Sequence, residues 1–214
     1  MNQAIIFDMD GTLFQTDKIL EPALEETFDV LREKGLWVGE TPIEKYRKIM
    51  GVPLSVVWET LCPNFSKDVR QKSNELFQEK LNEMIRRHKG ALYPNVILTL
   101  QTLSSKYLLF IASNGYKDYL QTIVDTYDLN LIFKNIYSIQ LIPSGDKSEL
   151  VKKVVEENKL IKAWVVGDRL SDFKAAKENG LISIGVNFDF AQEDELKQAD
   201  IVINDIKELT TLIP

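Results

Sequence analysis

Two aspartates spaced by two residues stand directly after a short apolar run near the start of the chain. Asp8 and Asp10 follow residues 4–7, and Gly11 comes next. Residues i and i+2 of a strand face the same side, so both carboxylates can address one small space beyond the strand's end. This arrangement suits covalent catalysis by one acid with proton transfer at the other. An acidic turn without catalytic function is the alternative, because Asp-Gly is a frequent turn dipeptide.

Polar residues that could hold a phosphate group follow two later parts of the chain. Ser113 and Asn114 come after the apolar run 107–112, where a hydroxyl and backbone N–H groups at a strand-to-helix junction can cradle phosphate. A turn and helix cap is the alternative, and by themselves these two residues favour it. Lys147 stands at the start of a predicted helix, where the helix dipole disfavours a positive charge. A bound anion nearby would explain a lysine at this position. Lysines are also common on protein surfaces, so a solvated side chain is the alternative.

A second pair of carboxylates, Asp168 and Asp172, follows the apolar run 163–166. Carboxylate oxygens at a strand end suit Mg²⁺, which binds through one or two carboxylates together with substrate phosphate. Asp172 can also be a cap or first-turn residue of the next helix. Both roles are compatible with a metal site.

The combined charge of these residues favours a metal. Asp8, Asp10, Asp168 and Asp172 bring four carboxylates to a site that would also bind a phosphate dianion. Lys147 alone cannot offset that charge. Phosphoryl transfer depends on stabilising charge on the phosphoryl oxygens, so the set predicts Mg²⁺.

The elements that position these residues alternate between strand and helix. Short apolar runs predict strands, and amphipathic patterns lie between the later ones. The predicted strands cover residues 5–7, 107–112, 136–139, 163–166, 182–186 and 201–203, and the predicted helices 96–105, 119–127, 149–158 and 173–179. This order predicts an α/β fold with a doubly wound, Rossmann-like parallel sheet.

One long segment interrupts the alternation. Residues 16–89 contain helical patterns separated by Gly and Pro breakers, with no convincing strand. We expect an all-helical cap there, inserted into a catalytic core of residues 1–15 and 90–214, with its mouth above Asp8 and Asp10. Short hinges are expected near residues 15–18 and 90–94.

Composition narrows the class of protein and its partners. The net charge is −6 and the pI near 5.0, which argues against nucleic acid or an anionic membrane surface as a partner. Cys62 is the only cysteine, so no intramolecular disulfide can form. No apolar stretch is long enough to span a bilayer, and no signal segment is recognisable. A cytoplasmic location is expected.

In order along the chain, these motifs resemble those of the haloacid dehalogenase superfamily, and the insert resembles the cap of its phosphoglycolate phosphatase-like branch. The resemblance implies that Asp8 is the nucleophile that forms an aspartyl phosphate and that Asp10 is the general acid/base. It implies further roles for the remaining residues: Ser113 and Asn114 bind the phosphoryl group, Lys147 neutralises it, Asp8, Asp10 and Asp168 hold Mg²⁺, and Asp172 orients Lys147.

The resemblance also limits the reaction. An acid at Asp10 disfavours halide release, which needs no proton. Leu54, after Gly51-Val52-Pro53, stands where sugar-phosphate mutases of this branch tend to have arginine. We therefore expect a Mg²⁺-dependent phosphatase acting on a small phosphate ester. A phosphotransferase or phosphomutase, or a catalytically silent binding protein of the same fold, are the alternatives. Phosphoglycolate, sugar phosphates, nucleotides and pyrophosphate all remain candidate substrates, and the oligomeric state is unknown.

Overall fold

The computed structural model describes residues 2–49, 52, 54–189 and 191–214. The chain forms two compact units: Met1–Gln15 with Leu92–Pro214, and Thr16–Ala91. They are described one after the other, as the core unit and the helical unit.

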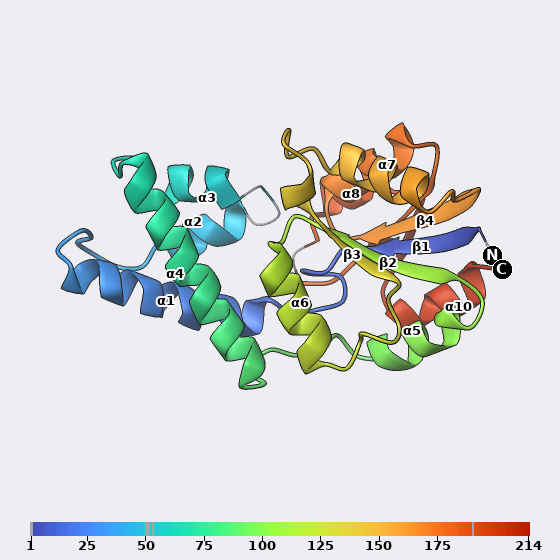
Figure 1. Cartoon of the computed structure of the whole chain (residues 1–214), viewed down its shortest axis with the longest axis horizontal. Coiled ribbons are helices and arrows are strands. Elements are labelled where there is room, and N and C mark those ends of the chain that lie inside the picture. Colours follow the sequence, from blue (N-terminus) through green and yellow to red (C-terminus); the bar gives the residue numbers. More distant parts are fainter. Residues whose placement is uncertain (1, 50–51, 53, 190) are drawn as a thin grey trace. The chain divides into compact units, whose positions relative to one another are not determined.

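The core unit is built on a parallel sheet of six strands in the order β3-β2-β1-β4-β5-β6, of which β1 to β4 are labelled in Figure 1. The strands are β1 (Gln3–Phe7), β2 (Leu108–Ser113), β3 (Asn135–Ser138), β4 (Lys162–Gly167), β5 (Ile182–Val186) and β6 (Ile201–Ile203). Each corresponds to a predicted strand. The prediction of an α/β fold with a doubly wound parallel sheet is confirmed.

Strand β1 lies at the centre of the sheet because its run of apolar residues can be buried on both faces. Phe7, its last residue, is in register with Ile111 of β2 and Val166 of β4. The N–H of Asp8 continues this pairing by donating to the Val166 carbonyl at 2.9 Å. The carboxyl ends of β1, β2 and β4 therefore share one edge, where ligands bind in open α/β sheets.

Helices cover both faces of the sheet, with α7 and α8 above and α5 and α10 below in Figure 1. The helices of the core unit are α5 (Val96–Ser104), α6 (Lys117–Thr126), α7 (Lys147–Glu157), α8 (Leu170–Glu178), α9 (Glu193–Leu196) and α10 (Leu209–Leu212). The core on one face joins Leu150, Val151 and Val154 of α7 to Ala4 and Ile6 of β1. The short helices α9 and α10 were not predicted, because one turn shows no amphipathic period.

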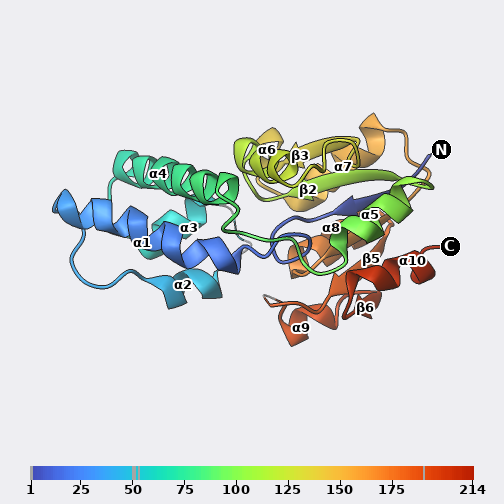
Figure 2. The ribbon, with the colours of Figure 1, turned by 90° about the horizontal axis from the view of Figure 1, so that it is seen from below.

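The helical unit contains α1 (Asp17–Glu33), α2 (Ile43–Lys48), α3 (Leu54–Leu61) and α4 (Lys67–Arg86). The long helices α1 and α4 lie side by side (Figure 2). Phe28 of α1 stacks on Trp58 of α3 with ring centroids 6.1 Å apart, and Phe77 of α4 meets the same indole edge-on. Every regular element in the described part of this unit is a helix. In the part of the chain that the structure describes, no helix is long and apolar enough to span a membrane.

Helix α1 begins earlier than its pattern indicated. The helical pattern of the sequence is clear only from residue 23, just after Pro22, but the helix starts at Asp17 and contains the proline. Pro22 removes one backbone hydrogen bond, while the buried side chains of Ile19 and Leu20 stabilise the turn before it. The expected hinge at 15–18 is therefore partly helical. Gly51, Pro53 and the side chain of Leu54, on which the argument against a mutase rests, lie outside the described residues and side chains.

Candidate active site

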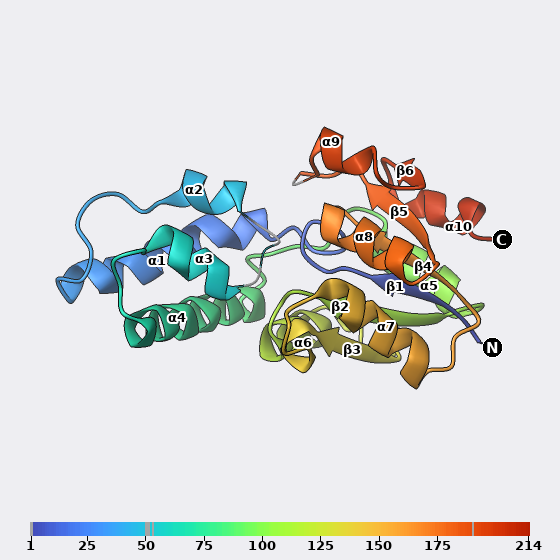
Figure 3. The ribbon, with the colours of Figure 1, turned by 90° about the horizontal axis from the view of Figure 1, so that it is seen from above.

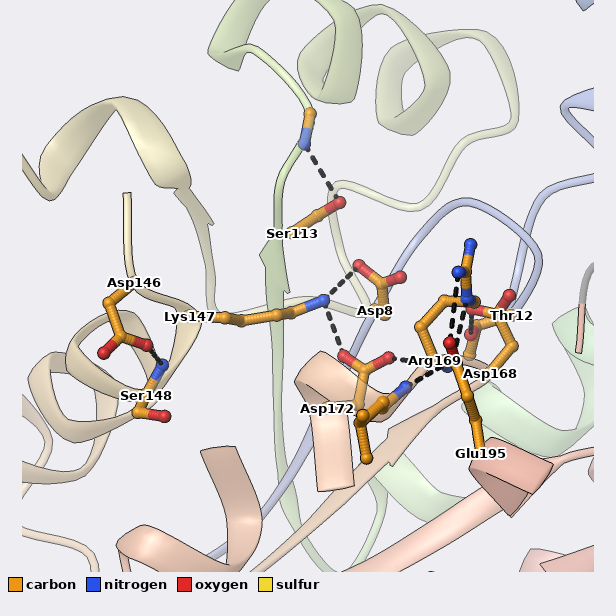
Figure 4. A network of polar contacts seen from close by, with 12 residues as sticks. Asp8, Thr12, Ser113, Asp146, Lys147, Ser148, Asp168, Arg169, Asp172 and Glu195 are labelled. Atoms are coloured by element: carbon orange, nitrogen blue, oxygen red, sulfur yellow. Dashed lines mark hydrogen bonds and ion pairs between the residues drawn. The ribbon is translucent and has the colours of Figure 1, made fainter. Parts of the chain in front are cut away.

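The centre of the site is Lys147, which lies between two carboxylates in Figure 4. Its Nζ is 2.8 Å from Asp8 Oδ1 and 2.6 Å from Asp172 Oδ1. Lys147 is the first residue of α7, Asp8 follows β1, and Asp172 belongs to the first turn of α8. All three side chains are buried. The structure thus joins three of the predicted site residues through direct ion pairs.

Asp168, the residue after β4, is 1% exposed and accepts a hydrogen bond from Thr12 Oγ1 at 3.2 Å. Gly11 allows this approach, since a Cβ at that position would lie 2.5 Å from Asp168 Oδ2. Gly11 also has φ of +74°, which glycine adopts without strain. The turn after β1 therefore needs a glycine for its conformation and for the space that Asp168 occupies.

The shifted pKa values in this cluster show where its charge is concentrated. Burial alone would lower the pKa of Lys147, but Asp172 and Asp8 outweigh it, so the pKa is raised and the amine stays charged. Burial raises the pKa of Asp172 to about 6, with Lys147 opposing the rise and Asp8 adding to it. Burial, together with Asp8 and Asp172, raises the pKa of Asp168 well above its ordinary value. Three buried carboxylates thus face the ammonium group of Lys147, and a further cation would relieve their repulsion.

The donor set of the cluster fits such a cation. Carboxylate oxygens of Asp8, Asp168 and Asp172 lie within 4.8 Å of one another. Asp172 already uses both oxygens, since Oδ1 meets Lys147 and Oδ2 accepts from the Arg169 N–H at 3.1 Å. Hard oxygen ligands of this kind suit a divalent cation such as Mg²⁺.

An ion pair that the sequence did not indicate fastens the loop between β4 and α8. Arg169 Nε is 2.9 Å from Glu195 Oε2, and the Leu170 N–H donates to the same oxygen at 2.8 Å. Glu195 lies on α9, which Figure 3 shows near α8. The Asp172 carboxylate accepts from the Arg169 N–H at the start of α8, so that helix begins at Leu170 instead of the expected residue 173. Glu195 is 26 residues away from Arg169, and no local pattern could have linked them.

Ser113 and Asn114 follow each other at the carboxyl end of β2. Ser113 is buried, and its Oγ accepts from the Gly115 N–H at 3.2 Å. Ser138, at the end of β3, donates to the Gly115 carbonyl at 2.6 Å. The turn is therefore held from both sides at the same sheet edge as Asp8.

Asp10 has a hydrogen-bond partner from another part of the core unit. Tyr119 of α6 donates its hydroxyl to Asp10 Oδ1 at 2.5 Å. Sequence reasoning assigned Tyr119 only to the start of a helix and missed this contact. A tyrosine on an otherwise apolar helix face is a usable signal, since a buried hydroxyl needs a polar partner.

The comparisons with known proteins place the chain in a family. The family model of haloacid dehalogenase-like hydrolases matches residues 5–186. A phosphoglycolate phosphatase of Vibrio parahaemolyticus is 24% identical over 220 residues, which cover 98% of this chain and 95% of that protein. A 5'-nucleotidase of Pseudomonas aeruginosa is 23% identical, covering 90% of this chain and 86% of the relative. Among solved structures, CbbY from Rhodobacter sphaeroides in complex with phosphate aligns with a TM-score of 0.83 at 20% identity, covering 98% of this chain and 96% of that one.

The parallel sheet, with an acidic cluster beside a buried lysine at its carboxyl edge, defines an α/β protein with a candidate active site there. The chain belongs to the haloacid dehalogenase-like hydrolase family. The predicted family and the predicted class, a phosphoric monoester hydrolase, are confirmed.

Proposed function

We propose that the protein is a Mg²⁺-dependent phosphatase that hydrolyses a small phosphomonoester through an aspartyl phosphate on Asp8. The observation that carries this proposal is the buried ion pair of Asp8 with Lys147, 2.8 Å apart. The pair keeps the Asp8 carboxylate ionised and oriented, so that it can attack phosphorus. The positive charge of Lys147 can also bind the phosphoryl group. Asp10 lies two residues after Asp8, in the turn that follows β1, and its partner is Tyr119. Two acids with different roles need different surroundings of this kind.

In the first step, an oxygen of the Asp8 carboxylate attacks phosphorus and the bond from phosphorus to the ester oxygen breaks. The leaving oxygen takes the proton that Asp10 carries, so the alcohol departs neutral. In the second step, ionised Asp10 takes a proton from water, and the water oxygen attacks phosphorus. The bond between phosphorus and Asp8 then breaks, which releases inorganic phosphate, restores the Asp8 carboxylate and leaves Asp10 protonated.

The remaining residues bind and orient the phosphoryl group in this proposal. Lys147 neutralises it, and Ser113 with the backbone of Asn114 donates hydrogen bonds to its oxygens. The fixed turn around Ser113 supports this role, because donors held in place need no reorganisation during the reaction. Asp172 orients Lys147 through the 2.6 Å ion pair.

Asp8, Asp168 and the backbone carbonyl of Asp10 would hold Mg²⁺. When bound, the metal supplies positive charge that stabilises the phosphoryl oxygens in the transition state. The raised pKa of Asp168, caused first by burial and then by its acidic neighbours, supports a cation at this place. Both oxygens of Asp172 already have partners in the protein, which supports its indirect role.

Replacement of the nucleophile tests the mechanism. Asp8→Asn should abolish turnover while circular dichroism and the melting temperature show a folded protein. Asp146→Asn is the matched control, because asparagine replaces aspartate well as a helix cap and Asp146 caps α7. Retained phosphatase activity in folded Asp8→Asn protein would contradict the proposed nucleophile.

We propose that the helical unit selects the substrate, since it is inserted directly after the turn that carries Asp10. The relatives named for phosphoglycolate and for 5'-nucleotides make these two classes the first to test. A phosphate-release screen should also include sugar phosphates and pyrophosphate, each with Mg²⁺ and with excess chelator. Activity that survives metal removal would contradict the role of Mg²⁺.

Transfer of the phosphoryl group to a second acceptor is the alternative. The same aspartyl phosphate would then react with an alcohol instead of water. Product analysis separates the two reactions, because hydrolysis yields free phosphate in amounts equal to the substrate consumed. Phosphate on a second sugar position would identify a transferase.

A further inference from the structure

We propose that Tyr119 is the residue that positions Asp10 for proton transfer, an inference that rests on the proposed function. Its hydroxyl donates to Asp10 Oδ1 at 2.5 Å, and its side chain is almost fully buried, with the residue 4% exposed. Tyr119 comes from α6, on the far side of β2 in sequence, 109 residues from Asp10. Nothing in the local sequence around Asp10 could supply this contact.

The ring of Tyr119 has a fixed place beside the turn after β2. A Cβ at Gly115 would lie 3.1 Å from Tyr119 Cδ1 and 3.0 Å from Leu120 Cδ2. These distances are shorter than ordinary contacts, so a larger residue at this position would require the side chains of Tyr119 and Leu120 to shift by a few tenths of an ångström. The turn that carries Ser113 and the helix that carries Tyr119 therefore form one packed assembly.

The last residue of β3 and the turn that follows it fix the start of α6 as well. Gln140 Oε1 accepts from the Lys117 N–H, the first of the helix, at 2.8 Å. Ser138 donates to the Gly115 carbonyl at 2.6 Å. Tyr119 is two residues beyond Lys117, so its hydroxyl extends from a helix turn that is held by hydrogen bonds and by packing. Sites built on fixed elements orient their groups better than sites on loops.

The backbone of Asp10 is already fixed by its own turn. The Met9 carbonyl accepts from the N–H groups of Leu13 and Phe14, both at 2.9 Å. The carboxyl group can still rotate about its bond to Cβ, a broad and soft torsion. The bond from Tyr119 restricts this rotation by holding Oδ1. Oδ2 is then the oxygen that gives its proton to the leaving group and takes one from water.

Leaving-group dependence distinguishes this role from mere packing. An ester with a poor leaving group needs a well-placed proton, whereas a good leaving group departs with little help. Loss of the hydroxyl should therefore harm poor leaving groups selectively. A general packing defect would reduce both reactions by the same factor.

The experiment compares kcat/KM of Tyr119→Phe and the parent on phenyl phosphate and p-nitrophenyl phosphate with Mg²⁺. We expect a loss of about tenfold or more on phenyl phosphate, the size of a lost hydrogen bond to a group that becomes charged as it gives up its proton. The loss on p-nitrophenyl phosphate should be several times smaller, with KM unchanged on both. Tyr137→Phe, which removes another buried hydroxyl bonded to Asn158, should change neither value.

A second comparison uses Asp10→Asn as background. Without an acid to position, the added Tyr119→Phe change should have little further effect, so the two losses should be far from additive. Equal losses on both esters, no loss, or additive losses would overturn the role of Tyr119 and leave the proposed function intact. A parent that hydrolyses no phosphate ester would overturn the proposed function itself, and this inference with it.

Discussion

Replacing Lys147 with methionine should strongly destabilise the metal-free protein. The side chains of lysine and methionine are similar in length, but methionine has no amine. It therefore leaves Asp8 and Asp172 without the Lys147 Nζ that lies 2.8 and 2.6 Å from their carboxylate oxygens. The side chains of the three residues are only 4%, 9% and 1% exposed, so water cannot replace the lost partner. Breaking a buried pair in this way costs about 3–5 kcal/mol.

Lys153→Met is the matched control on the same helix. Lys153 pairs with Glu157 at 2.7 Å, but the side chains are 37% and 47% exposed. Exposed pairs contribute about 0–1 kcal/mol, so this variant should lose little. The assay is urea unfolding followed by circular dichroism in excess chelator. Losses of equal size in Lys147→Met and Lys153→Met would refute the argument that burial decides the cost.

The stability deficit of Lys147→Met should also depend on pH. Lys147 lowers the pKa of Asp172, so its removal raises further a pKa that burial has already raised to about 6. A carboxyl with a raised pKa in the folded state takes up a proton on folding, so its contribution to stability is lost as pH rises through that pKa. The deficit should therefore be larger at about pH 8 than at about pH 5. A deficit that grows on acidification would contradict this reasoning.

Three further predictions concern the metal, the turn after β1 and the contact between Asp200 and Ser183 of β5. Mg²⁺ should raise the melting temperature of the parent, and Asp168→Asn should lose most of this rise in the same scan. Gly11→Ala should lower both the melting temperature and the Mg²⁺-dependent rise, since its Cβ would meet Asp168 Oδ2 at 2.5 Å. Asp200 accepts from the N–H and Oγ of Ser183, which lowers its pKa, so it stabilises the fold above its usual pKa near 4 and loses this effect below it. In Asp200→Asn, the free energy of unfolding measured by urea denaturation should therefore fall less steeply as the pH is lowered below about 4.

The sheet could be predicted because its strands leave a simple signal. Buried parallel strands are continuous apolar runs, as residues 4–7 of β1 illustrate, and the helices between the later strands imply parallel pairing. Once the strands are parallel, polar residues that follow them share one edge. The meeting of Asp8 with Lys147 and Asp172 follows from this rule together with their positions at element ends.

The contacts that the sequence did not reveal are long-range and come from elements with weak patterns. Glu195 belongs to a helix of a single turn, and its bond to Arg169 spans 26 residues. From the sequence, Tyr119 is expected on the apolar face of α6, and only the folded structure brings its hydroxyl to Asp10. Helix α1 extends through Pro22 because burial of its apolar side chains outweighs a local breaker. In each case tertiary packing decides what local preference cannot.

Helix α7 shows how a local rule and a functional demand are satisfied by adjacent residues. A helix N-terminus favours negative charge, yet its first residue is Lys147. Asp146 meets the local preference by capping the helix, with Oδ1 accepting from the Ser148 N–H at 2.8 Å, and Glu149 adds a second acid in the first turn. These two acids offset the unfavourable dipole at the helix start. Lys147 can then extend to Asp8 and Asp172, where its charge is needed. A lysine at the start of α7, which the helix dipole disfavours, is thus explained by its ion pairs with these two carboxylates.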